Sequence, residues 1–302
     1  MTFFGNLNFF FFTQVQSPGL LTTVQDLGRP GHGIDGVSRA GAADPLALRL
    51  GNLLLGNPAN TPALETTLLG GTYLFPDGAT IALTGATPSA LAPYEIHTIA
   101  PGQTIQLGPL TNGARCYLCV QGGIAIPKLA GSASTHLLSG LGGGPIPKGA
   151  VLEIGVPTNQ PRTLPIPEAL KPYRKTIRVT RGPQADLFDA KPFYQTEYQV
   201  TQDTNRMGIR LAGPPVPTTH NSQMRTEGVP LGAIQIPANG QPIILFVDQQ
   251  TTGGYPKIAN VITADLPSLG QLRPGDKIRF EQVSPVEARR LLLEQEAQIE
   301  SL

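Results

Sequence analysis

Short apolar runs separated by glycine and proline are the feature that most limits how this chain can fold. The 302 residues include 35 glycines and 30 prolines, and both residue types interrupt helices and strands and favour turns. The runs between them, for example residues 80–84, 116–120 and 151–156, have the length of strands and are too short for most helices. Because 40% of the residues are hydrophobic, the chain can still bury a core. The sequence therefore predicts a mainly β fold.

The remaining apolar runs fit the same prediction, and two segments depart from it. Asp44 followed by Pro45 and a series of leucines predicts a capped helix that ends at 56–58. Ser284 and Glu287 form a capping box around Pro285, which predicts a second helix within 284–302. Further strands are expected at residues 104–107, 177–179, 198–201, 233–236, 243–247, 277–280 and from 258 onward.

The length of the chain exceeds that of one ordinary domain, so we expect two lobes. Residues 157–172 contain five prolines and little periodicity, which is typical of a linker. The predicted organisation has an extra or disordered segment and two lobes, followed by the tail helix. Its boundaries are 1–12 for that segment, 13–156 for the N-terminal lobe, 157–172 for the linker, 173–283 for the C-terminal lobe and 284–302 for the helix.

Charge and cysteine usage exclude several classes of function. The formal net charge is +1, so the chain has no overall field that attracts nucleic acid or an anionic membrane. Cys116 and Cys119 lie in an expected strand, where this spacing sends them to opposite faces, and we interpret them as core residues. The four histidines are scattered, so no metal site is predicted. No signal peptide or membrane-spanning run is found, and a cytoplasmic protein is expected.

The segment 243–262 is the candidate active segment. Two expected strands flank a loop that carries one acid, two amides, hydroxyls, a glycine pair, a tyrosine and a lysine. A hairpin turn needs only a few turn residues, so this loop holds more reactive side chains than its structure requires. Rigid strands that hold a polar loop are a common way to position binding and catalytic groups.

Three other clusters have both a functional and a structural interpretation. Asp26 and Arg29 in a loop rich in glycine and proline are either site residues or a structural salt bridge. Asp44 either borders an anion site at a helix N-terminus or only caps that helix. Arg206 beside Asn205 suits a carboxylate or phosphate, or is a surface residue in a turn. The sequence leaves open whether Glu65 is buried or solvated.

Taken in order, these motifs resemble one known family. They are Ser-Pro-Gly-Leu-Leu-Thr-Thr-Val-Gln-Asp-Leu-Gly-Arg at 17–29, Gly-Ala-Ala-Asp at 41–44, Asp-Gln-Gln-Thr-Thr-Gly-Gly-Tyr-Pro-Lys at 248–257, and shorter matches at 56–57, 64–66, 122–123, 205–211, 232–237 and 274–280. The chain is identified as a member of the biotin-dependent carboxyltransferase, or allophanate-hydrolase-subunit-2-like, family over about residues 13–282. Within that family it resembles the C-type subunits of 5-oxoprolinases and an antagonist subunit of a kinase inhibitor.

The resemblance implies two cyclophilin-like β-barrel lobes with a few short helices and a C-terminal helix. It also implies an ATP- and Mg-dependent complex, with a small cyclophilin-like B-type subunit and an A-type subunit, that opens 5-oxoproline to L-glutamate. The implied catalytic residues are Asp248, Gln250 and Lys257. The implied substrate- or nucleotide-binding residues are Asp26, Arg29, Asp44, Asn205, Arg206, Gln235, Thr251, Gly253, Gly254 and Tyr255.

The chain departs from the family pattern in one region, and two other functions remain open. Ala133 stands where relatives commonly have arginine, the glycine-rich loop at 140–149 is short, and Ala150 replaces a frequent aspartate. The first alternative is a carboxyltransferase subunit for a urea- or amide-type substrate. It would use a separate biotin carrier, because this chain has no Met-Lys attachment motif. The second alternative is a non-catalytic subunit that antagonises a kinase-inhibitor partner.

Overall fold

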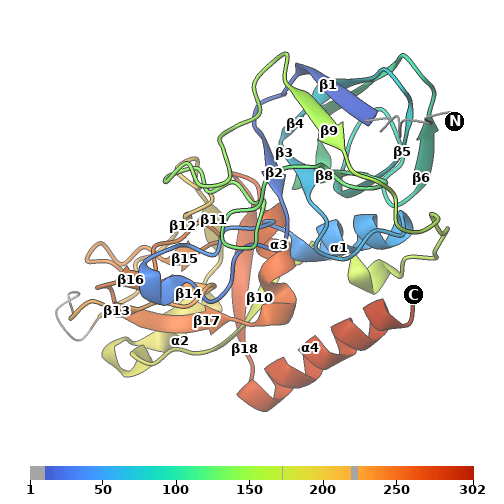
Figure 1. The fold of residues 1–302 in the computed structure, drawn as a ribbon. Helices are drawn as coiled ribbons and strands as arrows, with labels where there is room; N and C mark the ends of the chain where they lie inside the picture. The colour runs from blue at the N-terminus through green and yellow to red at the C-terminus, as the bar shows by residue number, and fades with distance from the viewer. Residues whose placement is uncertain (1–10, 172, 219–223) are drawn as a thin grey trace, which may run out of the picture.

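Two β-rich lobes meet at a waist, and helices gather near their junction (Figure 1). The structure is a computed structural model that describes residues 11–171, 173–218 and 224–302. The chain passes from the N-terminal lobe to the C-terminal lobe through the segment 155–175, and the last helix returns toward the first lobe.

The N-terminal lobe consists of two antiparallel sheets that enclose one core. One sheet has the strand order β7-β4-β1-β9 and the other β2-β3-β8-β5-β6. Leu64, Leu83 and Leu118 come from three neighbouring strands of the second sheet and pack in the core with Tyr73 and Phe75 from the first. The strands are β1 (Phe11–Ser17), β2 (Thr22–Gln25), β3 (Ala63–Thr67), β4 (Leu69–Phe75), β5 (Ala79–Thr87), β6 (Ile96–Ile99), β7 (Gln103–Pro109), β8 (Thr111–Val120) and β9 (Val151–Ile154).

The C-terminal lobe is a closed barrel with the strand order β10-β17-β14-β15-β12-β11-β18. Its first and last strands, β10 and β18, pair in parallel, and this pairing closes the barrel. Phe193 stacks on Phe280 in the core, with ring centroids 4.5 Å apart. The strands are β10 (Thr176–Arg181), β11 (Tyr198–Val200), β12 (Gly208–Ala212), β14 (Ala233–Gln235), β15 (Ile243–Leu245), β17 (Lys257–Val261) and β18 (Lys277–Gln282), and a separate ribbon pairs β13 (Glu227–Gly228) with β16 (Thr252–Gly253).

Both predicted helices form with the predicted caps. The Asp44 carboxylate accepts the Ala47 N–H at 2.9 Å at the start of α1 (Pro45–Leu54), and the Ser284 hydroxyl accepts the Glu287 N–H at 3.1 Å at the start of α4 (Pro285–Glu300). Arg49 of α1 forms a two-bond ion pair with Glu296 of α4, so the tail helix connects the two lobes. The other helices are α2 (Ala190–Gln195), α3 (Leu266–Gln271) and the 3-10 turns η1 (Gly33–Asp35), η2 (Glu168–Leu170), η3 (Ala185–Leu187) and η4 (Thr263–Asp265).

The mainly β fold is confirmed, and each strand expected from an apolar run overlaps an observed strand. Cys116 and Cys119 are free, lie on β8 and pack into two different core clusters, as predicted for opposite faces of a strand. Of the two predicted barrel lobes, the C-terminal one is a closed barrel, whereas the N-terminal one is a pair of sheets. Within the described residues, no helix is both long and apolar enough to cross a membrane.

The predicted domain boundaries remain a prediction, but two segments differ from their expected character. β1 begins at Phe11, inside the segment 1–12 that was expected to precede the fold, and residues 1–10 lie outside the described part. The expected linker packs on the N-terminal lobe over much of its length. Leu164 and Ile166 contact the cluster around α1, and the Arg162 N–H bonds to the Leu54 carbonyl at 2.8 Å.

Candidate functional site

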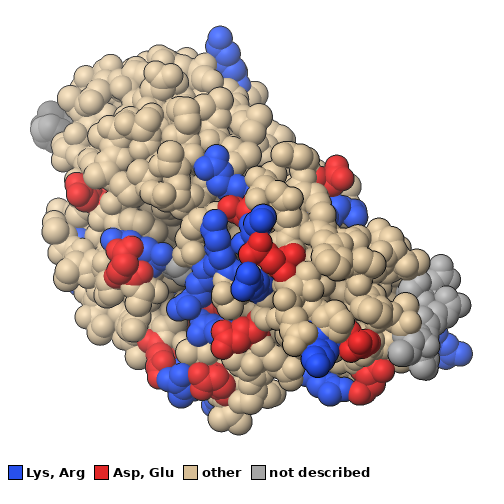
Figure 2. All heavy atoms as spheres, turned by 180° about the vertical axis from the view of Figure 1, so that it is seen from behind, with Lys and Arg blue, Asp and Glu red and all other residues tan. Residues whose placement is uncertain are grey.

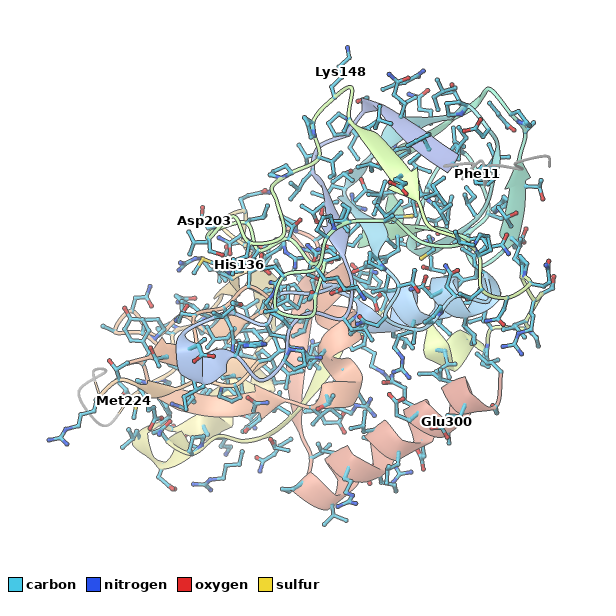
Figure 3. The ribbon with its side chains drawn as sticks, in the orientation of Figure 1. Phe11, His136, Lys148, Asp203, Met224 and Glu300 are labelled. Atoms are coloured by element: carbon cyan, nitrogen blue, oxygen red, sulfur yellow. The ribbon has the colours of Figure 1, made fainter. Side chains whose placement is uncertain are left out.

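Two adjoining cavities lie at the junction of the lobes and share the residues Val37, Ser38 and 249–252. We call them together the interlobe cleft. The larger has a volume of about 720 Å³ and is also lined by Arg29, Arg39 and 228–231. The smaller, of about 380 Å³, is also lined by His136, Leu138 and Asp248. Figure 3 shows His136 among the side chains between the two lobes.

The loop after β15 forms the C-terminal wall of the cleft, as the sequence predicted for the candidate active segment. The Asp248 N–H donates to the Arg206 carbonyl at 2.8 Å, and the Gln249 N–H donates to the Phe246 carbonyl at 2.9 Å. Pairing of β16 with β13 fixes the far end of the loop. Gln250 and Thr251 line both cavities, so the loop carries an amide and a hydroxyl into the cleft.

Asp248 and Arg206 form a buried ion pair behind this loop. Arg206 Nε and Nη2 donate to the two Asp248 carboxylate oxygens at 2.9 and 3.0 Å. Arg206 Nη1 reaches across the lobe boundary to Glu65 at 2.5 Å, and Nη2 also donates to the Gly41 carbonyl at 2.6 Å. All three side chains are buried. Every nitrogen of the Arg206 guanidinium is therefore engaged, and the group joins the lobes instead of facing an open site.

The charges of this cluster support one another. Burial by itself would lower the pKa of Arg206, but the Glu65 and Asp248 carboxylates outweigh that effect and raise it above the usual value. Glu65 also accepts the Tyr117 hydroxyl at 2.7 Å and the Ala43 N–H at 2.8 Å. Because both oxygens of Asp248 accept bonds from Arg206, the geometry does not favour the expected role of Asp248 as a general base.

Asp26 and Arg29 lie on the N-terminal wall but do not form the salt bridge that the sequence left open; within the described residues no such ion pair is found. Asp26 is buried and accepts four bonds from neutral donors. These are the hydroxyls of Ser132 at 2.5 Å and Ser134 at 2.6 Å, and the backbone N–H groups of Gly28 and Ala133, both at 2.8 Å. The Ala133 side chain is buried in the core, and its backbone keeps the contact with Asp26.

Several predicted site residues line a different hollow on the barrel, with a volume of about 380 Å³. Asn205, Gln235 and Tyr255 line it, and Gln250 belongs to this hollow as well as to the cleft. The Asn205 side chain accepts the Met207 N–H at 2.8 Å and so shapes its own turn. Gly253 lies in β16, where a Cβ would come within 2.8 Å of the Gln235 amide nitrogen, and Gly254 follows it.

Asp44 and Lys257 are not brought into the cleft, which corrects two sequence expectations. Asp44 caps α1 and accepts the Gln271 amide at 2.7 Å, and it lines a separate polar hollow. Burial raises the pKa of Asp44 to about 6. The buried Lys257 donates its ammonium to Glu227, and Lys257 is not among the residues that line the two cleft cavities.

Sequence reasoning missed His136 and left Glu65 undecided. His136 Nδ1 lies 2.6 Å from the Ser139 hydroxyl, and Nε2 lies 3.3 Å from the Asp248 carbonyl, so the histidine supports the active loop. No motif marks His136, because its contacts come from distant loops. Glu65 had a usable signal, since a charged residue inside a buried strand requires a partner.

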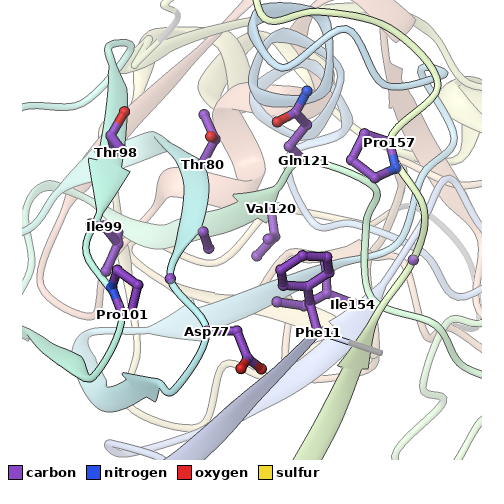
Figure 4. Close-up of a pocket in the computed structure, with 13 residues that line it drawn as sticks. Phe11, Asp77, Thr80, Thr98, Ile99, Pro101, Val120, Gln121, Ile154 and Pro157 are labelled. Atoms are coloured by element: carbon purple, nitrogen blue, oxygen red, sulfur yellow. The ribbon is translucent and has the colours of Figure 1, made fainter. Parts of the chain in front are cut away.

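The other cavities and the surface are less suited to chemistry. A cavity of about 280 Å³ in the N-terminal lobe is lined mainly by apolar groups such as Phe11, Val120 and Ile154, with Asp77 at its margin (Figure 4). Figure 2 shows positive and negative side chains mixed on one face, in agreement with the small net charge. Among the described residues, no group of three or more His, Cys, Asp or Glu is arranged to hold a metal ion.

Comparison with known proteins places this architecture among carboxyltransferase domains. The family model described as "Carboxyltransferase domain, subdomain A and B" matches residues 35–282. The C subunit of 5-oxoprolinase from Haemophilus influenzae is 38% identical, with 93% of this chain and 94% of that protein aligned. The C subunit of 5-oxoprolinase from Escherichia coli is 40% identical, with 94% of this chain and 95% of that protein aligned.

Larger relatives contain this chain as one part. Urea amidolyase of Saccharomyces cerevisiae is 34% identical over 96% of this chain, which spans 18% of that protein. The solved structure of Kluyveromyces lactis urea amidolyase superposes with a TM-score of 0.90 at 33% identity. That superposition covers 96% of this chain and 20% of the larger one.

Proposed function

The chain belongs to the carboxyltransferase domain, subdomain A and B, family, and from that membership we propose that it is the C subunit of an ATP-dependent 5-oxoprolinase complex. In this role it helps to open the lactam of 5-oxoproline to L-glutamate. The observation that carries the proposal is the match to the C subunits of two 5-oxoprolinases over more than nine-tenths of both chains. The urea amidolyases contain a large additional part that this chain lacks.

The interlobe cleft suits the demands of that reaction. A lactam is a poor electrophile, so its carbonyl must be polarised or its oxygen modified before water can attack. Gln250 and Thr251 bring neutral hydrogen-bonding groups to one wall, and Arg29 brings a positive charge to the other. These three residues are proposed to contact the substrate. The adjoining hollow at Asn205, Gln235, Gly253, Gly254 and Tyr255 shares Gln250 and borders the site.

Four of the predicted site residues act by positioning in this proposal. Asp248 and Arg206 hold the active loop against the N-terminal lobe, and Asp26 fixes the loop that carries Arg29. Lys257 anchors Glu227, whose neighbour Gly228 lines the cleft. Asp44 keeps the structural role of helix cap.

The cleft does not fit magnesium-bound ATP. Among the described residues that line it, Asp248 is the single acid, and Arg206 occupies both of its carboxylate oxygens. Magnesium in proteins is usually bound through available carboxylates together with the phosphates of the nucleotide. We therefore assign nucleotide binding to another member of the complex and derive no step on this chain through ATP.

The partners are proposed to be a small cyclophilin-like B-type subunit and an A-type subunit, all in the cytoplasm. The margin of the cleft supports a docking role, because Ile34 is 95% exposed and Leu138 is 72% exposed. Exposed aliphatic side chains beside a functional cleft are typical of a surface that a partner covers. A partner that covers this margin would also limit the entry of water to the cleft.

The test is reconstitution. Purified chain mixed with its B- and A-type partners, 5-oxoproline and ATP should release L-glutamate, and omission of this chain should abolish the release. The partners are checked separately with the corresponding chain of an active relative. No glutamate from this chain with partners that work alongside that relative contradicts the proposal.

A second function is favoured by the close superposition on urea amidolyase. In this alternative, the chain transfers a carboxyl group between a separate biotin carrier and a urea- or amide-type substrate. Carboxybiotin turnover that depends on urea, in a mixture in which 5-oxoproline is inert, would support this alternative and replace the first proposal.

A further inference from the structure

Arg29 is a buried cation without an ionic partner among the described residues. Its side chain is 1% exposed, although it lines the larger cavity of the cleft. Nη2 donates to the Ser134 carbonyl and Nε donates to the Leu129 carbonyl at 3.4 Å, but Nη1 has no partner in the described part of the chain. Burial lowers the pKa of Arg29, while Asp26 and Asp248 act in the opposite direction. Buried charges are normally paired, so this guanidinium is prepared for an anion.

The nearby acids are already occupied. The Asp26 carboxylate accepts bonds from two serine hydroxyls and two backbone N–H groups, and the Asp248 carboxylate accepts from Arg206. Neither acid lies within ion-pair distance of Arg29 in the residues that the structure describes. The unused donor of Arg29 is therefore left for a molecule that enters the cleft.

Gln249 provides the complementary group on the opposite wall. Its amide nitrogen donates to the Val229 carbonyl at 2.9 Å, which fixes the orientation of the amide because that carbonyl needs a donor. The amide oxygen, Oε1, is buried and has no partner among the described residues. Gln249 and Arg29 line the same cavity. The cavity thus combines one unused cationic donor with one unused neutral acceptor.

From this pairing we propose that Arg29 binds the carboxylate of the substrate and that Gln249 Oε1 accepts an N–H of the same molecule. The ligand class is a small carboxylate that also carries an amide or lactam N–H. This inference rests on the proposed function and extends it, because it names the two residues that recognise the substrate and the polarity of their contacts. Gln250 and Thr251 remain available for the carbonyl of the ring.

The experiment compares three ligands with the reconstituted complex: 5-oxoproline, its neutral carboxamide, and its N-methyl derivative. A charge-assisted hydrogen bond in a buried site corresponds to about 10- to 100-fold in affinity. The wild-type complex should therefore show a KM for each analogue that is raised by about that factor. Arg29→Gln should raise the KM for 5-oxoproline similarly and abolish the preference over the carboxamide. Gln249→Leu should abolish the preference over the N-methyl derivative.

Arg39→Gln is the matched control, because Arg39 lines the same cavity but is exposed. It should leave both preferences intact. Equal treatment of acid and carboxamide by the wild-type complex overturns the proposal without any variant, and so does loss of the preference in Arg39→Gln but not in Arg29→Gln. If Arg29→Gln does not fold, Arg29→Lys, which keeps the charge, should retain the preference.

Failure of the proposed function is distinguished by direct binding. If the complex releases no glutamate, titration calorimetry of the full chain with the same three ligands still tests the recognition. Binding of 5-oxoproline that exceeds binding of the carboxamide and depends on Arg29 supports the inference. Equal or absent binding of the acid and the carboxamide contradicts it.

Discussion

Arg206 Nη1 in the C-terminal lobe lies 2.5 Å from Glu65 Oε1 in the N-terminal lobe, and both side chains are buried. The same guanidinium holds the carboxylate of Asp248 at the base of the active loop. One arginine therefore couples the packing of the lobes to the position of the loop that forms one wall of the cleft. Separation of the lobes would leave two carboxylates and a guanidinium without partners.

Glu65→Gln should strongly destabilise the protein. It leaves the buried Arg206 with one carboxylate fewer, and removal of one member of a buried ion pair typically costs about 3–5 kcal/mol. Chemical denaturation measures the change in the free energy of unfolding. Arg49→Gln is the control, because the Arg49–Glu296 pair also joins the lobes but is partly exposed and should cost about 1 kcal/mol or less. Equal losses for the two variants would contradict the role assigned to the buried cluster.

Asp44→Asn should alter how stability depends on pH. The pKa of Asp44 is raised from 3.8 to about 6 by burial, so between these values the folded protein keeps a proton that the unfolded chain has released. The contribution of Asp44 to stability is then present below about pH 4 and is lost as the pH rises through 6, by up to about 3 kcal/mol. The difference in unfolding free energy between wild type and variant should fall over this window. A difference that is constant from pH 4 to 7 would refute the prediction.

Thr251→Val should lower the activity of the reconstituted complex without unfolding the chain. The change removes the hydroxyl that the active loop carries into the cleft and conserves the shape of the side chain. Loss of one hydrogen bond to the reacting group corresponds to about tenfold or more in kcat/KM. Glutamate release and thermal denaturation are measured together. Thr158→Val, at an exposed position outside the cleft, should change neither.

Lys257→Met and Glu227→Gln should reduce activity to a similar degree, because each removes the same contact beside the cleft. Glu227 is 41% exposed and can be solvated after the change, so the cost in stability should stay at about 1–2 kcal/mol. Steady-state kinetics of both variants distinguish this positioning role from direct catalysis. A loss of several hundredfold in Lys257→Met alone would restore Lys257 as a catalytic residue.

Leu138→Glu should weaken assembly with the small B-type subunit. The change places a charge in the exposed margin of the cleft, where a partner would have to bury it. Sedimentation or pull-down with the purified partner measures the complex. Val286→Glu, at an exposed valine on α4, is the control and should assemble normally. Undiminished assembly of Leu138→Glu would place the docking surface elsewhere.

The sequence predicted the features whose causes are local. The caps of α1 and α4 depend on residues within three positions of each other, and both form as expected. The active loop was recognisable because its excess of polar groups lies in one short segment between two strands. The cleft formed by this loop and the segment that carries Arg29 was likewise anticipated from the ordered motifs.

What the sequence could not predict depends on distant pairing. Glu65 and Arg206 are 141 positions apart, so neither reveals whether the other neutralises it. The ammonium of Lys257 bonds to Glu227, thirty positions earlier, and this contact keeps Lys257 from the role expected of it. β3 escaped notice because its buried Glu65 and Thr66 break the apolar pattern, although both are satisfied by neighbouring strands.

The pairing of β10 with β18 has a consequence for the synthesis of the protein. The barrel cannot close until residues 277–282 have left the ribosome, because the strand that completes it is the last one in the chain. Until then, β10 and β11 present unpaired edges, which can associate with other chains. A premature stop that removes only β18 and α4 should therefore give an aggregating product, and a cell would gain from chaperone binding late in translation.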